Sequence, residues 1–124
     1  MQEEKLIAVF SEAARAVGAE VTTCPDVEAV VDYVKQLATG PVLVPLFASA
    51  ERLGLNSALK TSGVALVESN LRQEAATAAV GVTGANFAFA ATGTVVLEST
   101  AEDIRLATTL PEHHVVLLDP AKIL

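Results

Sequence analysis

The chain has 124 residues and a mass of 12.8 kDa, which predicts one domain. Hydrophobic residues make up 52% of it and charged residues 19%, a balance that excludes a disordered chain. The net charge of −7 disfavours nucleic acids and anionic membrane surfaces as partners, since no cluster of Lys and Arg offsets it.

Cys24 is the single cysteine, so the chain can form no internal disulfide and no Cys-rich zinc or iron–sulfur site. The sequence from Met1 to Lys5 has no basic stretch followed by an apolar one, as a signal peptide would have. No window of about 18 residues is continuously apolar, so we expect no membrane span. Together these features predict a cytoplasmic protein.

The first third of the chain predicts two amphipathic helices. Residues 6–17 carry apolar side chains at helical spacing and end at Gly18, and a short strand is expected at residues 20–23. The second helix covers residues 27–38. Its start is predicted either as a capping box of Thr23 with Asp26 or as a cap by Asp26 alone.

The middle of the chain alternates short apolar runs with helical stretches. Residues 41–46 predict a buried strand, residues 48–59 a weak helix, residues 63–67 another strand and residues 71–79 a helix. This alternation indicates an α/β fold with a mostly parallel sheet, in which residues 42–44, 64–67 and 115–118 are expected to be central, buried strands.

Residues 80–98 predict a strand, a bend and then a hairpin that turns at Thr92-Gly93. A helix is expected over residues 100–110, started by a capping box of Thr100 with Asp103. The last strand is expected at residues 114–118.

The turn Thr92-Gly93-Thr94 is the first candidate ligand-binding element. A glycine bend can direct backbone N–H groups outward together, and the flanking hydroxyls add further donors, which suits a phosphate or a carboxylate. The same three residues are also compatible with a plain hairpin turn.

Arg105, early in the following helix, is the second candidate. Its guanidinium could bind an anion through two parallel hydrogen bonds. The competing interpretation is an exposed helix arginine that pairs with Glu102 or Asp103.

Three other features carry weaker signals. His114 could act as an acid or base, whereas His113 and His114 are expected on opposite faces of a strand and so cannot easily share a metal. Cys24 is expected to be an ordinary small apolar residue. Gly81 and Gly84 lack the spacing of a nucleotide-binding loop and are expected to serve close packing and a bend.

Two motifs together resemble the signature of the LUD domain, the family of lactate utilization protein C. They are the run VGVTGANFAFAATGTVVL at residues 80–97 and the later Arg105 followed by LPEHHV. The resemblance covers the chain from about residue 3 to its end. The chain departs from the family pattern at Asn86 and Ala91, where acidic residues are usual, and members usually continue beyond the last strand. We therefore expect a single LUD-like domain over residues 1–124 without the C-terminal part of the family domain.

The resemblance implies a three-layer α/β/α sandwich of the sugar-phosphate isomerase and CoA-transferase superfamily (NagB/RpiA/CoA-transferase-like). It implies an accessory subunit in lactate utilization, in which L-lactate is oxidised to pyruvate together with iron–sulfur partner proteins. The chain itself is expected to hold no cofactor, to bind a small anionic ligand and to form a homo-oligomer. The alternative is a stand-alone enzyme of the isomerase or CoA-transferase type that binds a phosphorylated or carboxylated molecule at Thr92, Gly93, Thr94 and Arg105. A purely structural module that binds no ligand is the third interpretation. Whether the chain is itself an enzyme stays open.

Overall fold

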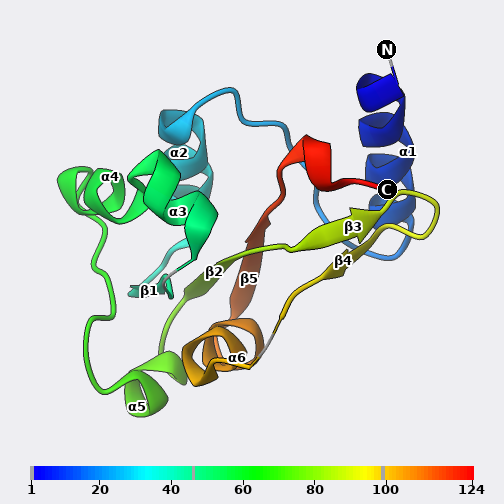
Figure 1. Ribbon diagram of the computed structural model, residues 1–124. Helices are drawn as coiled ribbons and strands as arrows, with labels where there is room; N and C mark the ends of the chain where they lie inside the picture. Colours follow the sequence, from blue (N-terminus) through cyan, green and yellow to red (C-terminus); the bar gives the residue numbers. More distant parts are fainter. Residues whose placement is uncertain (1, 46, 99) are drawn as a thin grey trace. The chain divides into compact units, whose positions relative to one another are not determined.

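The computed structural model describes residues 2–45, 47–98 and 100–124, so Leu46, predicted at the end of a strand, lies outside the described residues. In chain order, the elements labelled in Figure 1 are α1 (Gln2–Ala16), α2 (Val27–Leu37), β1 (Val42–Leu43), α3 (Ala48–Leu53), α4 (Leu55–Thr61), α5 (Leu71–Ala75), β2 (Val80–Gly84), β3 (Phe87–Phe89), β4 (Thr94–Val96), α6 (Glu102–Thr109), β5 (His113–Leu117) and the 3-10 helix η1 (Pro120–Lys122). No membrane-spanning helix is found among these described segments.

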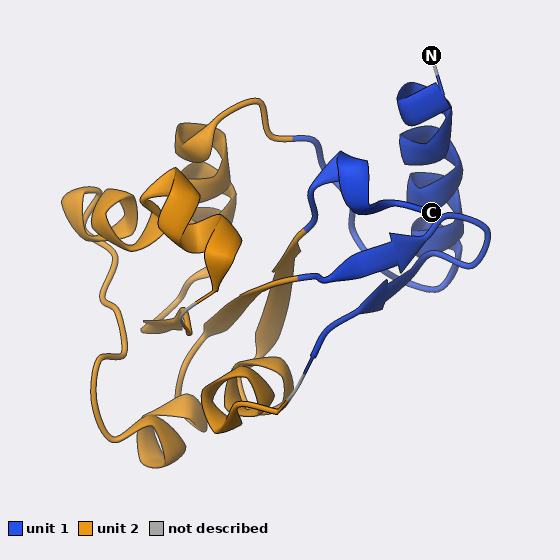
Figure 2. Cartoon of the chain, in the orientation of Figure 1, with its two compact units in different colours: residues 1–23, 85–98, 118–124 blue, residues 24–84, 99–117 orange. Residues whose placement is uncertain are grey.

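The chain forms two compact units, which Figure 2 shows in different colours. Unit 1 consists of residues 1–23, 85–98 and 118–124, and unit 2 of residues 24–84 and 99–117.

Unit 2 is built on a parallel sheet with the strand order β1-β2-β5. β1 pairs with β2 through Val42 and Val80. On its other side, β2 pairs with the whole of β5, from Val80 opposite His113 to Gly84 opposite Leu117. This sheet confirms the predicted α/β class with mostly parallel strands. β2 is the central strand, and Val80 and Val82 are fully buried, as expected for a strand that is covered on both faces.

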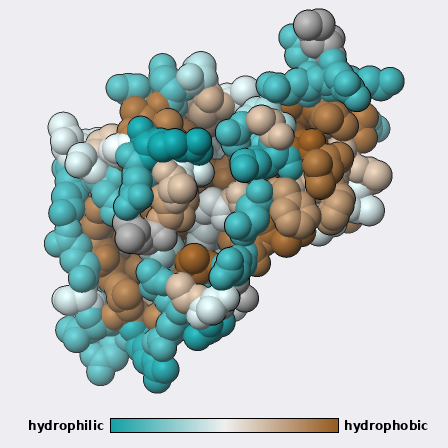
Figure 3. Space-filling view, in the orientation of Figure 1, coloured by the Kyte–Doolittle hydropathy of each residue, from teal (hydrophilic) through white to brown (hydrophobic). Residues whose placement is uncertain are grey.

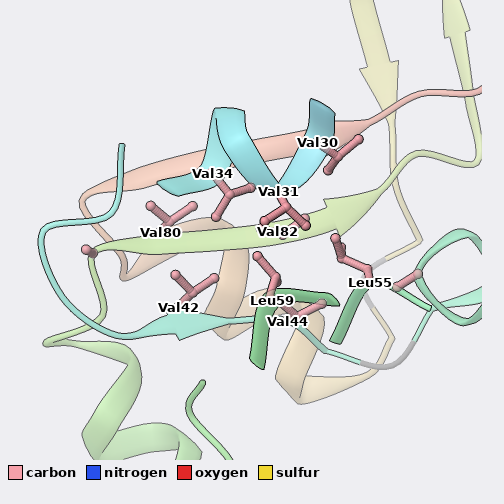
Figure 4. Packing of buried hydrophobic residues seen from close by; sticks show 11 residues of the cluster. Val30, Val31, Val34, Val42, Val44, Leu55, Leu59, Val80 and Val82 are labelled. Carbon is pink, nitrogen blue, oxygen red and sulfur yellow. The ribbon is translucent and has the colours of Figure 1, made fainter. Parts of the chain in front are cut away.

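Helices cover both faces of this sheet, which gives unit 2 its three layers. One face packs against α2, α3 and α4, and Figure 4 shows the side chains of α2 and α4 meeting those of β1 and β2. The buried residues of this layer are Val30, Val31, Val34, Val42, Val44, Ala50, Leu55, Leu59, Ala79, Val80 and Val82. The other face packs against α5 and α6 through Leu43, Ala75, Ala78 and Ala107. Neighbouring residues of β1 therefore serve opposite layers, because side chains alternate along a strand.

Two predicted strands of the sheet differ from the structure. Residues 64–67 form one parallel bridge, between Leu66 and Val42, and two hydrogen bonds flank it. β5 pairs with β2 on one side and lies at the edge of the described sheet, so the prediction that it is central is wrong. Its first two residues are exposed and the remainder half-buried, which is typical of an edge position.

The structure shows which residues cap the N-termini of α2 and α6, the two helices for which caps are predicted. The side chain of Asp26 accepts a hydrogen bond from the backbone N–H of Ala29 at 2.9 Å, so Asp26 alone caps α2. The capping box of Thr100 with Asp103 is wrong, because Ala101 is the N-cap of α6 and no side chain caps it. The Asp103 carboxylate instead accepts from the N–H of Ile104 at 3.0 Å.

Unit 1 combines α1, the antiparallel hairpin β3–β4 and η1. The hairpin register pairs Phe87 with Val96 and Phe89 with Thr94, which confirms the predicted hairpin. The expected strand at residues 20–23 is not formed. The end of the chain adds a third segment, since the N–H of Leu124 donates to the carbonyl of Ala88 at 2.7 Å.

The core of unit 1 is small and rich in alanine. It consists of Phe10, Ala14, Ala88, Ala90 and Ile123. Several larger apolar side chains stay at the surface, among them Val9, Phe89 and Leu124. Figure 3 shows the resulting apolar surface over α1, next to its hydrophilic N-terminal end.

Candidate functional site

The predicted anion-binding turn is the loop that joins β3 to β4 in unit 1. Gly93 adopts a positive φ of 67°, and its N–H donates to the carbonyl of Phe89 at 3.0 Å. A Cβ atom on Gly93 would lie only 2.4 Å from the backbone nitrogen of Ala14. Glycine is required here because the turn closes directly against the backbone of α1 and because the left-handed conformation disfavours a side chain.

The two threonines of this turn form a pair of hydroxyls. Thr92 and Thr94 are exposed, and their Oγ1 atoms lie 2.8 Å apart in a hydrogen bond. One hydroxyl donates to the other, which leaves the second hydrogen free to donate outward. The Gly93 amide is already bonded within the turn, whereas the pair of hydroxyls keeps one hydrogen that can be donated to a ligand. Ligand binding by Thr92, Gly93 and Thr94 stays a prediction.

Arg105 lies on the exposed side of α6, in unit 2. Its Nη1 donates to the carbonyl of Thr100 at 2.7 Å, so the guanidinium is held along the first turn of the helix. The pKa of Glu102 is lowered mainly by its hydrogen bond to Arg72, then by the charge of Arg72, and Arg105 adds a smaller effect in the same direction. The charge of Arg105 therefore acts on a neighbouring acid, and its role toward a ligand stays a prediction.

A second polar centre, in unit 2, joins β2 to β5. The Oγ1 atom of Thr83 lies 2.7 Å from Nε2 of His114. His114 pairs in register with Gly81, and Thr83 lies two residues further along the same face of β2, so the imidazole reaches the hydroxyl diagonally. The sequence indicates His114 as a candidate but gives no sign of Thr83, because the two residues are 31 positions apart and only the strand register brings them together.

The environment of this pair differs at its two ends. Thr83 is 1% exposed, whereas His114 lies at the surface of the edge strand with its ring turned toward the threonine. Burial of the ring lowers the pKa of His114 below its usual range. The imidazole is therefore neutral at physiological pH, and its chemistry is that of a hydrogen-bonding group rather than a cation.

The glycines of β2 serve packing, as predicted. A Cβ atom on Gly81 would lie 2.1 Å from the carbonyl oxygen of Ala107, so the backbone of α6 rests directly on this residue. A Cβ atom on Gly84 would lie 2.8 Å from the ring of Phe47. These distances explain both glycines without a bound phosphate.

Cys24 and the histidines offer no further reactive cluster. Cys24 packs partly buried against the valine and leucine core, and its pKa is raised by burial and, to a smaller extent, by Asp26. His113 is exposed, with its Nε2 3.9 Å from the carboxylate of Glu112. In the part of the chain that the structure describes, no three metal-ligating side chains lie close enough together to hold an ion.

The two departures from the family pattern lie in the hairpin of unit 1. Asn86 bonds to the C-terminal end of β4 and to the residues just after it: its N–H donates to the carbonyl of Val96 at 2.8 Å, and its Oδ1 accepts from the N–H of Glu98 at 2.6 Å. Ala91 is exposed in the turn before Thr92. Asn86 therefore has a structural function in closing the hairpin.

Comparisons with known proteins agree with the resemblance in the sequence. The chain is 34% identical over 74 residues to the "Uncharacterized electron transport protein YkgF" of Escherichia coli (strain K12), covering 59% of this chain and 16% of that protein. It is 42% identical over 53 residues to "Lactate utilization protein B" of Shouchella clausii (strain KSM-K16), covering 43% of this chain and 11% of that protein. The aligned parts thus span less than a fifth of either relative, and no solved structure matches. The model of the LUD domain matches residues 7–124, which include parts of both units, and the chain therefore belongs to the LUD domain family.

Proposed function

We propose that this chain takes part in lactate utilization as a cytoplasmic accessory subunit of a redox system. The observation that carries the proposal is the match of the LUD domain to residues 7–124. Two relatives support it through their names, since one is a lactate utilization protein and the other an electron transport protein.

The accessory role follows from the cysteine content. Iron–sulfur clusters are held mainly by several cysteine thiolates, and this chain has only Cys24. That thiol is half-buried, and its raised pKa keeps it protonated at neutral pH. The clusters that accept electrons from lactate are therefore proposed to reside in partner proteins.

The proposal assigns a small carboxylate, such as L-lactate or pyruvate, as the ligand. The hydroxyls of Thr92 and Thr94 in unit 1 and the guanidinium of Arg105 in unit 2 are two separate candidate contacts, and each is tested by itself. A charged hydrogen bond contributes about 1.5–3 kcal/mol, so Arg105→Ala should weaken binding roughly tenfold to a hundredfold. Thr94→Val should weaken it about fivefold, since a neutral hydroxyl contributes about 1 kcal/mol.

Calorimetry with L-lactate and pyruvate measures both effects. Arg52→Ala is the matched control for Arg105, because Arg52 is also an exposed helix arginine of unit 2. Thr22→Val is the control for Thr94, because Thr22 is an exposed threonine of unit 1. Equal affinity of all four variants and the wild type would remove these residues from the proposal.

Co-purification tests the accessory role. A tagged full-length chain is isolated from its own host, and the associated proteins are analysed for iron and acid-labile sulfide. We expect partners with iron–sulfur clusters whose absorbance bleaches when L-lactate is added under anaerobic conditions. Partners without clusters, together with an unchanged rate of lactate oxidation in a deletion strain, would contradict the proposal. Saturable ligand binding and turnover by the isolated chain would favour the stand-alone enzyme.

A further inference from the structure

The hydroxyl of Thr83 is buried and must find a hydrogen-bond acceptor. Thr83 is 1% exposed, and a buried hydroxyl that keeps no partner costs free energy. Among the residues that the structure describes, the one hydrogen-bond partner of the Thr83 hydroxyl is Nε2 of His114, at 2.7 Å. The hydrogen of this hydroxyl is therefore directed at the imidazole.

The direction of this bond determines the protonation of the ring. Nε2 can accept the Thr83 hydrogen only if it carries no hydrogen itself. A neutral imidazole with an unprotonated Nε2 carries its hydrogen on Nδ1. If Nε2–H donated instead, the threonine hydrogen would need another acceptor, and the described residues around Thr83 provide none.

We propose that Thr83 fixes His114 as the neutral Nδ1–H tautomer, and that Nδ1–H forms a hydrogen-bond donor site for an anionic oxygen of a small carboxylate or phosphate. Thr83 is the positioning residue and His114 the group that touches the ligand. The inference is independent of the lactate proposal, since it uses neither the Thr92–Thr94 turn nor Arg105.

Three features of unit 2 support this assignment. His114 lies in the edge strand β5 and is exposed, so a ligand can approach the ring from outside the sheet. Nδ1 has no hydrogen-bond partner among the described residues, which leaves its hydrogen available. The side of the ring that packs against the sheet is partly buried, which lowers the pKa of His114 and leaves the ring neutral at physiological pH. In enzymes, neutral imidazole groups are known to donate hydrogen bonds to substrate oxygens.

The tautomer is measured directly by nitrogen NMR of the full chain with labelled histidine. At pH 7.5 we expect Nδ1 of His114 to be protonated and Nε2 to show the shift of a hydrogen-bond acceptor. Thr83→Ser retains the hydroxyl and should retain this pattern. Thr83→Val has a similar shape without the hydroxyl, and the ratio of the Nδ1–H to the Nε2–H form should fall at least about fivefold. An Nε2–H or a protonated ring in the wild type, or an unchanged ratio in Thr83→Val, would overturn the inference.

The donor site is tested by titrating the same samples with acetate, L-lactate and inorganic phosphate. We expect a saturable shift of the His114 signals in the wild type and in Thr83→Ser, and weaker binding in Thr83→Val. His113→Gln is the control, because His113 is exposed and lies outside the pair. A response to acetate and lactate alone identifies a carboxylate site, and a response to phosphate alone identifies a phosphate site. The absence of a saturable shift with all three probes would overturn the donor site and leave the pair a structural contact.

Discussion

In each unit, one helix approaches a strand or a turn so closely that only glycine fits between them. In unit 2 the backbone of α6 rests on Gly81 of the central strand, and in unit 1 the backbone of α1 rests on Gly93 of the hairpin turn. Gly81 is required only because it has no side chain to clash with the helix, whereas Gly93 must also adopt a positive φ of 67°. The comparison shows that glycines in one short segment of sequence can be required for different physical reasons.

The surroundings of the two contacts also differ. Gly81 lies in a sheet that has a core of valine and leucine on one face and small residues under α6 on the other. Gly93 lies in a solvent-exposed loop, beside a core built largely of alanine. A dense core resists displacement more strongly than a loop does, so the same added methyl group should cost more in unit 2 than in unit 1.

Gly81→Ala should have the largest effect on stability. The new Cβ would lie 2.1 Å from the carbonyl oxygen of Ala107, and neither the central strand nor α6 can move without disturbing the core. We expect the free energy of unfolding to fall by about 3 kcal/mol, measured by urea denaturation. Gly40→Ala is the control, because its Cβ would make an ordinary contact of 3.8 Å with Ala79. Equal stability of the two variants would contradict the close packing of α6.

Gly93→Ala should have the next largest effect, about 2 kcal/mol, from the contact with α1 and from the left-handed backbone. Hydrogen exchange should show the loss of protection in α1 and the hairpin of unit 1. Gly18→Ala separates the two causes, because Gly18 has a φ of 99° but nothing within 4 Å of its Cβ. We expect about 1 kcal/mol for this control. A loss as large as that of Gly93→Ala would show that the backbone conformation alone explains Gly93.

The pH dependence of stability should sharpen the contrast, because His114 belongs to unit 2. Its pKa is lower in the folded chain than its usual value of about 6.5, so the unfolded chain binds a proton first as the pH falls. The contribution of His114 is complete above pH 6.5 and is lost as the pH falls toward the folded pKa. His114→Gln should therefore show a shallower decline of unfolding free energy between pH 7 and 5, measured by denaturant unfolding at each pH. Parallel curves for the variant and the wild type would contradict the burial of the ring.

The smallest effect is expected from the ion pair between Arg72 and Glu102, which connects α5 to α6. The guanidinium contacts both carboxylate oxygens, at 2.6 and 3.1 Å, and lowers the pKa of Glu102. Both side chains are exposed, so water and salt screen the pair. A double-mutant cycle with Arg72→Gln and Glu102→Gln should give a small coupling that disappears in 1 M salt. A coupling that persists at high salt would show that the pair is less exposed than the structure has it.

Much of the fold could be predicted from periodicity. The apolar spacing gave α2 its position, Asp26 marked its start, and the run around Thr92-Gly93 marked the hairpin. These signals are local, since a helix face or a turn is encoded by neighbouring residues. Predictions that needed tertiary information were weaker. The segment around Leu66 has the composition of a strand but forms a single bridge, and the first residues of β5 are exposed at an edge that its apolar run does not reveal.

For the candidate sites too, the features encoded by neighbouring residues could be predicted, and those that depend on tertiary contacts could not. The threonine turn and Arg105 were found by residue type, yet the sequence does not show that the Gly93 amide is bonded within the turn or that Arg105 donates to Thr100. The pairing of Thr83 with His114 depends on the register of two parallel strands that are distant in the sequence. Such a contact has no local signature.

Segments of the two units alternate along the chain, and this order constrains how the chain can fold while it is synthesised on the ribosome. Unit 1 is assembled from three separate segments, and Ile123 belongs to its core. Because α1 is synthesised before residues 118–124, its apolar face can be fully covered only after Ile123 has been added. Unit 2 has all its strands by Leu117, so it can complete its sheet first. During this interval the nascent chain exposes α1, and this helix is where a chaperone would be expected to bind.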